Sequence, residues 1–453
     1  MFAFDWFKKT FFSPLPAPQV EAPTALSFRF KIVVIEFADN VESSGGEIIA
    51  RLLQSKPYLE VSYFSEPFSK SFLTLDSRSL FDFIDKGQSL LEKLRADVLL
   101  WGYREGERIR LNFQTARQYD NADGSVISML DSLYIPAALL QEDALFPQAV
   151  GNLIYGALIS AVNVMTPESR IQRRYLLKKI IDSLSSDNSA KTLSIEYMPY
   201  IMNFLGIIYL SYSRDNSDEK DFKIVKNLFE TAIKHQDLIK APIHLGCIYY
   251  HLGQLYDFAT QTMLKRPQSY FKGAIGNYRQ AQKYLSKYNY PYDYGYISYK
   301  LSRLFFNYWR QKEDLQALRD VVAQLREAEK IFTYALFPDF WAEIEGLLGS
   351  NLALLGSLTK SEDICELAVA SYKNQQKVIT EKRDPLAWAQ IQQSIGDIYY
   401  RLGKNNAEKN LLEEALEYFH DALYIFENME RREEAEKITA SIAKTSRLLN
   451  API

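Results

Sequence analysis

The chain has 453 residues, which is too long for one simple core, so two or more structural units are expected. Its net charge of −3 gives no overall basic field for nucleic acid, and 47% of its residues are hydrophobic, as in ordinary globular proteins. The only two cysteines, Cys247 and Cys365, argue against a disulfide framework and favour a reducing, cytoplasmic compartment.

Residues 1–24 are predicted to form an aromatic arm and a proline-rich linker. In "MFAFDWFKKTFF", Phe4, Phe7 and Phe11 share one face of a short helix with Trp6 at its flank, and "SPLPAPQVEAP" cannot continue a helix. We expect these aromatic side chains to dock onto a partner or onto the protein's own surface. The alternatives are a peripheral contact between residues 1–12 and the inner membrane, and simple disorder.

Residues 25–140 carry the pattern of a small mixed α/β domain. Strand patterns at 28–38 and 59–65 alternate with helical patterns at 43–55 and 77–95, and a hairpin follows at 96–120. A last strand or helix start is expected near "SVISMLDSLYIP". This order predicts a mixed sheet with its helices on one face.

The hairpin of this domain resembles the N-terminal domain of TolB and related FlgO-like domains. The matching residues are Ala96, Asp97, Val98, Leu99, Gly102 and Arg108. The resemblance implies an interaction module without catalysis, of a kind that bacterial proteins often couple to helical repeats.

Two helices, 142–163 and 167–185, are predicted to connect this domain to the rest of the chain, within a connecting segment of residues 141–190. The second helix has a basic set consisting of Arg170, Arg173, Arg174, Lys178 and Lys179. A solvated helix face is the simplest interpretation, and binding of an acidic partner or a phospholipid headgroup is the alternative.

Residues 191–453 repeat themselves. Pro291, Pro338 and Pro385 are 47 residues apart, and Ser302, Gly349 and Gly396 each follow a proline by eleven residues. "LGCIYYHLG" (245–253) also aligns with "IGDIYYRLG" (395–403), which gives Gly246 the role of Gly396, and Gly206 opens a further copy. Each unit reads as two antiparallel amphipathic helices that approach closely at the glycine. In "YNYPYDYGYISY" (288–299), one repeat joins the next, and Tyr288 and Tyr292 are expected to pack between them.

This pattern resembles the elongated tetratricopeptide repeats of some bacterial proteins. The signature residues of the last copy are Ile395, Gly396, Tyr399, Ala415, Phe419 and Ala422. The expected fold is therefore mainly α, a right-handed α-solenoid of helical hairpins with a C-terminal capping helix, preceded by the small mixed α/β domain.

The resemblance also implies a binding groove on the first helix of each hairpin. The residues at the family's groove positions are Tyr200, Asn203, Tyr250, His251, Tyr296, Tyr299, Arg303, Phe306, Asn307, Gln390, Gln393, Tyr400 and Arg401. This aromatic and amide-rich set suits a protein segment. The alternative is that some of these side chains pack against the N-terminal domain or the arm.

No catalytic or metal-binding motif stands out. His244 and His251 are seven residues apart, but neither a cysteine nor a carboxylate completes a metal set with them. "SSGGE" (43–47) could hold an anion with its N–H groups but lacks the lysine of a P-loop. We therefore expect a non-enzymatic scaffold without cofactor that binds a protein partner or a second copy. A membrane assembly factor and an enzyme with its site in the α/β half are the alternatives.

Overall fold

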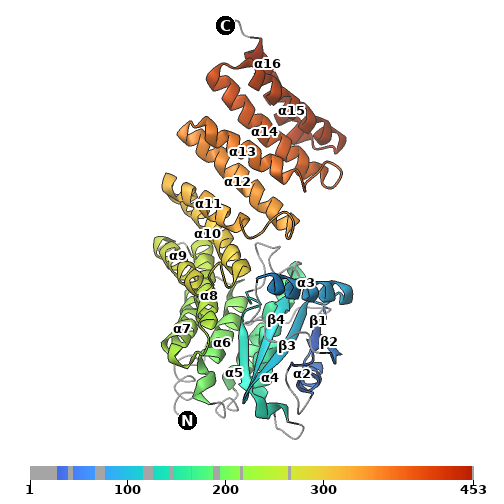
Figure 1. Cartoon of the computed structure of the whole chain (residues 1–453), viewed down its shortest axis with the longest axis vertical. Coiled ribbons are helices and arrows are strands. Elements are labelled where there is room, and N and C mark those ends of the chain that lie inside the picture. The colour runs from blue at the N-terminus through green and yellow to red at the C-terminus, as the bar shows by residue number, and fades with distance from the viewer. Residues whose placement is uncertain are drawn as a thin grey trace. The chain divides into compact units, whose positions relative to one another are not determined.

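The computed structural model describes residues 28–38, 44–66, 77–115, 126–141, 146–164, 166–186, 194–214, 218–263 and 267–450 (Figure 1). It confirms a helical solenoid preceded by a small mixed sheet domain. The chain divides into two compact units, Met1–Tyr294 and Gly295–Ile453, here called unit 1 and unit 2. The boundary falls in the first turn of α10 (Pro291–Lys312).

The sheet of unit 1 has five strands in the order β2-β1-β3-β4-β5. Their bounds are β1 Phe30–Ile35, β2 Leu59–Phe64, β3 Val98–Glu105, β4 Arg108–Thr115 and β5 Ser132–Pro136. β1 pairs in parallel with β2 and β3, whereas β4 is antiparallel to β3 and β5. A strand therefore forms within each of the predicted segments 28–38 and 59–65, and the predicted hairpin forms as β3 and β4, with residues 116–120 outside the described residues. The segment "SVISMLDSLYIP" ends in a strand.

The helices of the sheet domain cover both faces, so the prediction of helices on one face is wrong. Helix α2 (Gly45–Gln54) shares a core with Val34 and Leu100, whereas α3 (Ser77–Leu94) packs through Phe83 against Trp101, on the opposite face of β3. The reason is topological. β2 and β3 lie on opposite sides of β1, so two right-handed crossovers must place their helices on opposite faces.

The core of the sheet domain continues into the first repeats without a break. The short η2 (Ala137–Leu140), α4 (Gln148–Ala161) and α5 (Pro167–Ser186) follow the sheet, and one buried cluster runs from Phe30 to Ala259. The two connecting helices therefore form as predicted. The predicted boundary at residue 191 falls inside unit 1.

The repeat region consists of helical pairs and a final helix. After η4 (Ile195–Tyr197), its elements are α6 Met198–Ser213, α7 Glu219–Lys234, η5 Gln236–Leu238, α8 Pro242–Thr262, α9 Pro267–Tyr284, α10, α11 Leu315–Glu329, α12 Pro338–Thr359, α13 Glu362–Gln375, α14 Pro385–Asn406, α15 Lys409–Asn428 and α16 Arg432–Leu449. Proline is tolerated at these helix starts because the first-turn N–H has no partner within the helix. Most of the surface of α16 is exposed, as expected of a cap.

The recurring glycines bring the two helices of a hairpin into contact. A Cβ added at Gly206 would lie 2.5 Å from the ring of Phe229, 23 residues later in the chain. A Cβ added at Gly349 would lie 2.9 Å from the ring of Tyr372, and one added at Gly396 would lie 2.8 Å from the ring of Phe419. In both pairs the aromatic residue again follows the glycine by 23 residues. These glycines therefore have equivalent roles, and a side chain at any of them would push the helices apart.

Gly246 does not belong to this set, which corrects the sequence alignment. Its added Cβ would meet Leu285, whereas that of Gly253 would overlap the ring of Tyr278, the residue 47 positions before Leu325. Gly253 also follows Pro242 by eleven residues, the same interval as from Pro385 to Gly396. The intervals between successive small residues, from Gly206 through Gly253, Ser302 and Gly349 to Gly396, are therefore 47, 49, 47 and 47 residues. With Gly246 in place of Gly253, the first two intervals would be 40 and 56 residues.

The tyrosine-rich segment is a turn followed by the start of α10. Tyr292 is buried, and its ring centroid lies 6.2 Å from that of Phe81 in α3. Tyr288 is 78% exposed, so the expectation that it packs between repeats is wrong. It precedes the helix, in the turn, where no neighbouring element covers it.

Candidate partner-binding face

The predicted groove residues differ sharply in exposure. Their side chains come from α6, α8, α10 and α14. The buried members are Tyr200, Asn203, Tyr250, His251, Tyr296 and Tyr299; the partly or fully exposed members are Arg303, Phe306, Asn307, Gln390, Gln393, Tyr400 and Arg401. All the exposed members belong to unit 2.

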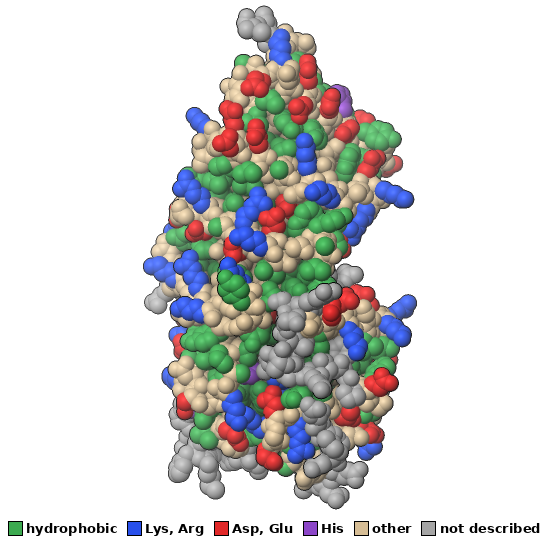
Figure 2. Space-filling view, in the orientation of Figure 1, with side chains coloured by type: hydrophobic (Ala, Val, Ile, Leu, Met, Phe, Trp, Pro, Cys, Tyr) green, Lys and Arg blue, Asp and Glu red, His purple; other side chains and the backbone are tan. Residues whose placement is uncertain are grey.

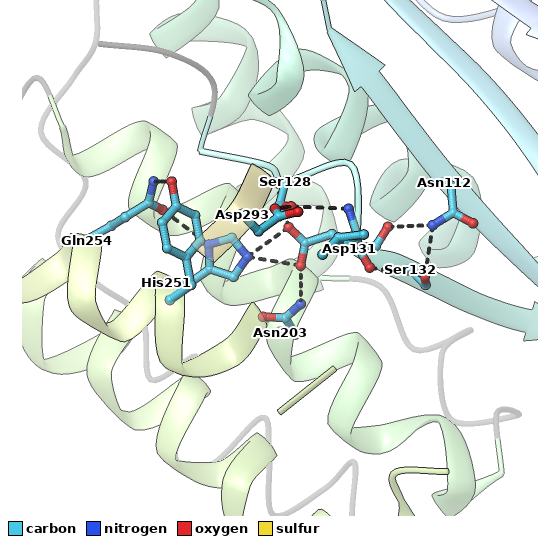
Figure 3. Close-up of polar contacts among 10 residues, drawn as sticks. Asn112, Ser128, Asp131, Ser132, Asn203, His251, Gln254 and Asp293 are labelled. Carbon is cyan, nitrogen blue, oxygen red and sulfur yellow. Dashed lines mark hydrogen bonds and ion pairs between the residues drawn. The ribbon is translucent and has the colours of Figure 1, made fainter. Parts of the chain in front are cut away.

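In unit 1 the face of α6 and α8 is filled by the turn at residues 126–131, directly before β5. The carboxylate of Asp131 accepts hydrogen bonds from Asn203 Nδ2 at 3.2 Å and from the backbone N–H of Ser128 at 2.8 Å (Figure 3). His251 Nε2 lies 2.9 Å and 3.0 Å from its two oxygens, and both side chains are fully buried. Asn203 and His251 thus hold a segment of the protein itself.

Both ring nitrogens of His251 face oxygen atoms. Gln254 Oε1 lies 3.2 Å from Nδ1, and the Gln254 amide is oriented by its donation to the Tyr250 hydroxyl at 2.9 Å. These contacts at both ring nitrogens fix the orientation of the buried imidazole.

The same turn is anchored at two further points. The Ser128 hydroxyl donates to Asp293, in the first turn of α10, at 2.8 Å. Asn112 of β4 donates to the backbone oxygen of Asp131 at 2.9 Å and to Ser132 at 2.8 Å. The turn is thus fixed to the sheet on one side and to the repeat helices on the other (Figure 3).

An aromatic cluster lies beside this network. Tyr134 of β5 stacks at a tilt on Tyr200 with ring centroids 4.5 Å apart, and His244 meets both rings edge-on. His244 Nε2 is 3.3 Å from the Tyr134 hydroxyl. Burial, followed by the charge of Arg110, lowers the pKa of His244 to about 3, so this imidazole is neutral.

His244 and His251 therefore have separate roles: His244 packs in the aromatic cluster, and His251 contacts Asp131. No group of three metal-ligating side chains occurs in the part of the chain that the structure describes. Sequence reasoning missed Asp131, Tyr134 and Arg110, because neither "SMLDS" nor the alternating polar residues of β4 match any motif.

In unit 2 the equivalent face is partly open. Tyr296 and Tyr299 stack with ring centroids 6.1 Å apart, and the Tyr299 hydroxyl donates to Glu343 of α12 at 2.5 Å. Further along α10, Phe306 stacks on Trp309 at 5.6 Å. Within the described residues, the side-chain amides of Asn307, Gln390 and Gln393 have no hydrogen-bond partner.

The cations of α5 divide between the interior and the surface, with Arg170 and Lys179 exposed. Arg173 is buried and donates to the backbone oxygen of Val162 at 3.3 Å, and Arg174 lies over the ring of Tyr212. Lys178 pairs with Asp182, and Lys179 lies over Tyr175. On the face shown in Figure 2, the described basic and acidic side chains are interspersed.

The N-terminus of α2 already holds an anion. Glu36 Oε1 accepts the backbone N–H of Gly46 at 2.9 Å, and Oε2 accepts the Tyr63 hydroxyl at 2.5 Å. A Cβ at Gly46 would lie 2.8 Å from the Cα of Glu36, so this glycine permits a close approach. The "SSGGE" segment thus packs against a carboxylate of the protein.

The arm residues Phe4, Trp6, Phe7 and Phe11 lie outside the described residues, so their predicted docking stays a prediction.

None of the helices within the described ranges combines the length and the apolar character that a bilayer crossing requires.

Compared with known proteins, the chain matches no family model, and no curated protein matches its sequence.

Proposed function

We propose that this protein is a non-enzymatic scaffold that binds a segment of a protein partner on the face formed by α10, α12 and α14, the first helices of the tetratricopeptide-like hairpins in unit 2. One observation carries the proposal: in unit 1 the first-helix face of α6 and α8 is filled by Asp131 and the residues before it, whereas several predicted groove residues of α10 and α14 in unit 2 are partly exposed. The contact in unit 1 supports the proposal, because there the face binds a segment of the same chain.

The exposed side chains suit an extended peptide. Asn307 and Gln393 offer both donors and acceptors that are not used within the described residues, as a peptide backbone requires. Tyr400 adds contact area with a polar tip, and Arg303 and Arg401 add cationic donors. Recognition would therefore combine backbone hydrogen bonds with aromatic and charged contacts.

A displayed library of random short peptides, selected against the full chain, tests the proposal. Selected peptides should lose about tenfold or more in affinity for Arg401→Glu, because the substitution removes a donor from the face and reverses its charge. Arg319→Glu is the matched control, since Arg319 is exposed on α11, outside the predicted face. Failure to select any peptide, or equal losses in both variants, would contradict the proposal.

The sequence of the arm favours a second candidate, a peripheral membrane assembly factor. Residues 1–12 pair aromatic side chains with lysines, a composition that suits a membrane interface. Co-sedimentation with anionic vesicles should then be lost when residues 1–24 are removed. Equal sedimentation of both forms would point away from the arm, and no sedimentation of either would remove this candidate.

A further inference from the structure

A chain of three polar side chains joins the last two full hairpins of unit 2. Gln376, which follows α13, donates from Nε2 to Gln392 Oε1 of α14 at 2.6 Å. Gln392 donates in turn from Nε2 to Asp421 Oδ2 of α15 at 2.7 Å. Gln392 is 4% exposed, so both hydrogen bonds of its amide satisfy a buried group.

One period of 47 residues earlier, the equivalent positions hold Glu329, Glu345 and Asn374. Asn374 Nδ2 donates to Glu345 Oε1 at 3.1 Å, which reproduces one link of the later chain. Glu345 is fully buried, and its Oε2 accepts no hydrogen bond within the described residues. The side chain that faces it is another carboxylate, Glu329.

Among the described residues, no cationic side chain forms an ion pair with Glu345. From α11 it meets Glu329, whose charge is already paired with Arg326 at 2.8 Å. From α13 it meets only the neutral groups of Ser371 and Asn374. Two carboxylates in contact cannot both be ionised without a large cost, and a proton on Oε2 would turn the second link into a hydrogen bond.

We propose that Glu345 carries a proton on Oε2, directed at the Glu329 carboxylate, and that its release makes the packing of α11, α12 and α13 sensitive to pH. In the link between Glu329 and Glu345, this proton takes the place of the amide N–H that Gln376 donates to Gln392 in the next repeat. Burial raises the pKa of Glu345 to about 7, and the charge of Glu329 acts in the same direction.

The sign of the effect follows from this direction. The folded state binds the proton more tightly than the unfolded state, so the contribution to stability is complete below the ordinary pKa of Glu345, 4.5, and is lost as the pH rises to about 7. Over that range the unfolding equilibrium constant should rise about tenfold per pH unit from this site alone.

Glu345→Gln tests the proposal in the full chain, because it installs the residue that the next repeat carries. Urea unfolding between pH 5 and pH 8 should show that the advantage of the variant over the wild type grows with pH and levels off above pH 7. Glu366→Gln, at an exposed position on α13, is the control and should run parallel to the wild type. Parallel curves for Glu345→Gln and the wild type would overturn the proposal.

Hydrogen exchange and infrared spectroscopy locate the effect. Amides of α12, corrected for the intrinsic pH dependence of exchange, should lose protection between pH 5 and pH 7 in the wild type but not in Glu345→Gln. The wild type should also show a protonated carboxylic acid band at pH 5.5 that is absent from Glu345→Gln and altered in Glu329→Gln. A wild type without this band would refute the proton on Glu345.

Discussion

Asp131 connects the sheet domain to α6 and α8 through a side chain that is fully buried. Its partners Asn203 and His251 are 72 and 120 residues away in the sequence, so no local pattern could have indicated either contact. The groove prediction placed Asn203 and His251 on the correct helices. Packing against the N-terminal domain was the alternative left open by the sequence, and it is what Asn203 and His251 do.

Replacing Asp131 by Asn should destabilise unit 1 by about 2–3 kcal/mol, because it removes the buried carboxylate that accepts hydrogen bonds from Asn203 and the Ser128 N–H and lies against His251. Urea unfolding at pH 6 followed by circular dichroism measures the change. Asp237→Asn, at an exposed position in η5, should alter stability by less than about 0.5 kcal/mol. A loss in Asp131→Asn no larger than in this control would show that the buried contact contributes little.

His244 should make unit 1 sensitive to acid. Its pKa is lowered from 6.5 to about 3, so the folded state binds fewer protons than the unfolded state in this range. This contribution to stability is present above pH 6.5 and is lost as the pH falls toward 3. Over that range the unfolding equilibrium constant should rise about tenfold for each pH unit that the pH falls. His244→Phe keeps an aromatic ring in the cluster and should remove this part of the slope in unfolding titrations from pH 7 to pH 4. An unchanged slope would contradict the assignment.

At the scale of elements, two glycines of the α8–α9 hairpin should respond oppositely to alanine. A Cβ at Gly253 would overlap the Tyr278 ring, whereas a Cβ at Gly276 would meet nothing within 4 Å. We expect Gly253→Ala to destabilise the protein by about 1–3 kcal/mol through overpacking and Gly276→Ala to stabilise it by about 0.5–1 kcal/mol. Thermal unfolding of both variants measures the difference, and a loss in both would show that the contact at Gly253 is not decisive.

Much of the element order could be predicted from sequence, because hydrophobic periodicity and proline positions are local signals. The match between "LGCIYYHLG" and "IGDIYYRLG" gave Gly246 the wrong role. The shared "YY" and "LG" occur in α8 seven residues before the position that the repeat assigns to them in α14. The interval of eleven residues from Pro242 to Gly253 would have identified the right glycine. The faces covered by α2 and α3 depend on strand order, which is a long-range property.

At the scale of the whole molecule, the division into two units predicts that distant substitutions act on different unfolding events. Asp131→Asn should lower the midpoint of one calorimetric transition, and Gly396→Ala should lower that of the other, because Asp131 lies in unit 1 and Gly396 in unit 2. Additive shifts in the double variant would agree with this division. If both substitutions shift a single common transition, the units unfold together.

The constant period of unit 2 also makes its hairpins interchangeable building blocks. Residues 338–384 constitute one complete period, so a tandem duplication of this stretch should extend the array by one hairpin. In the lengthened protein the first Glu345 would still face Glu329, while the duplicated one would face Gln376, whose amide can donate to it. The extra hairpin would thus be added without a second contact that weakens as the pH rises.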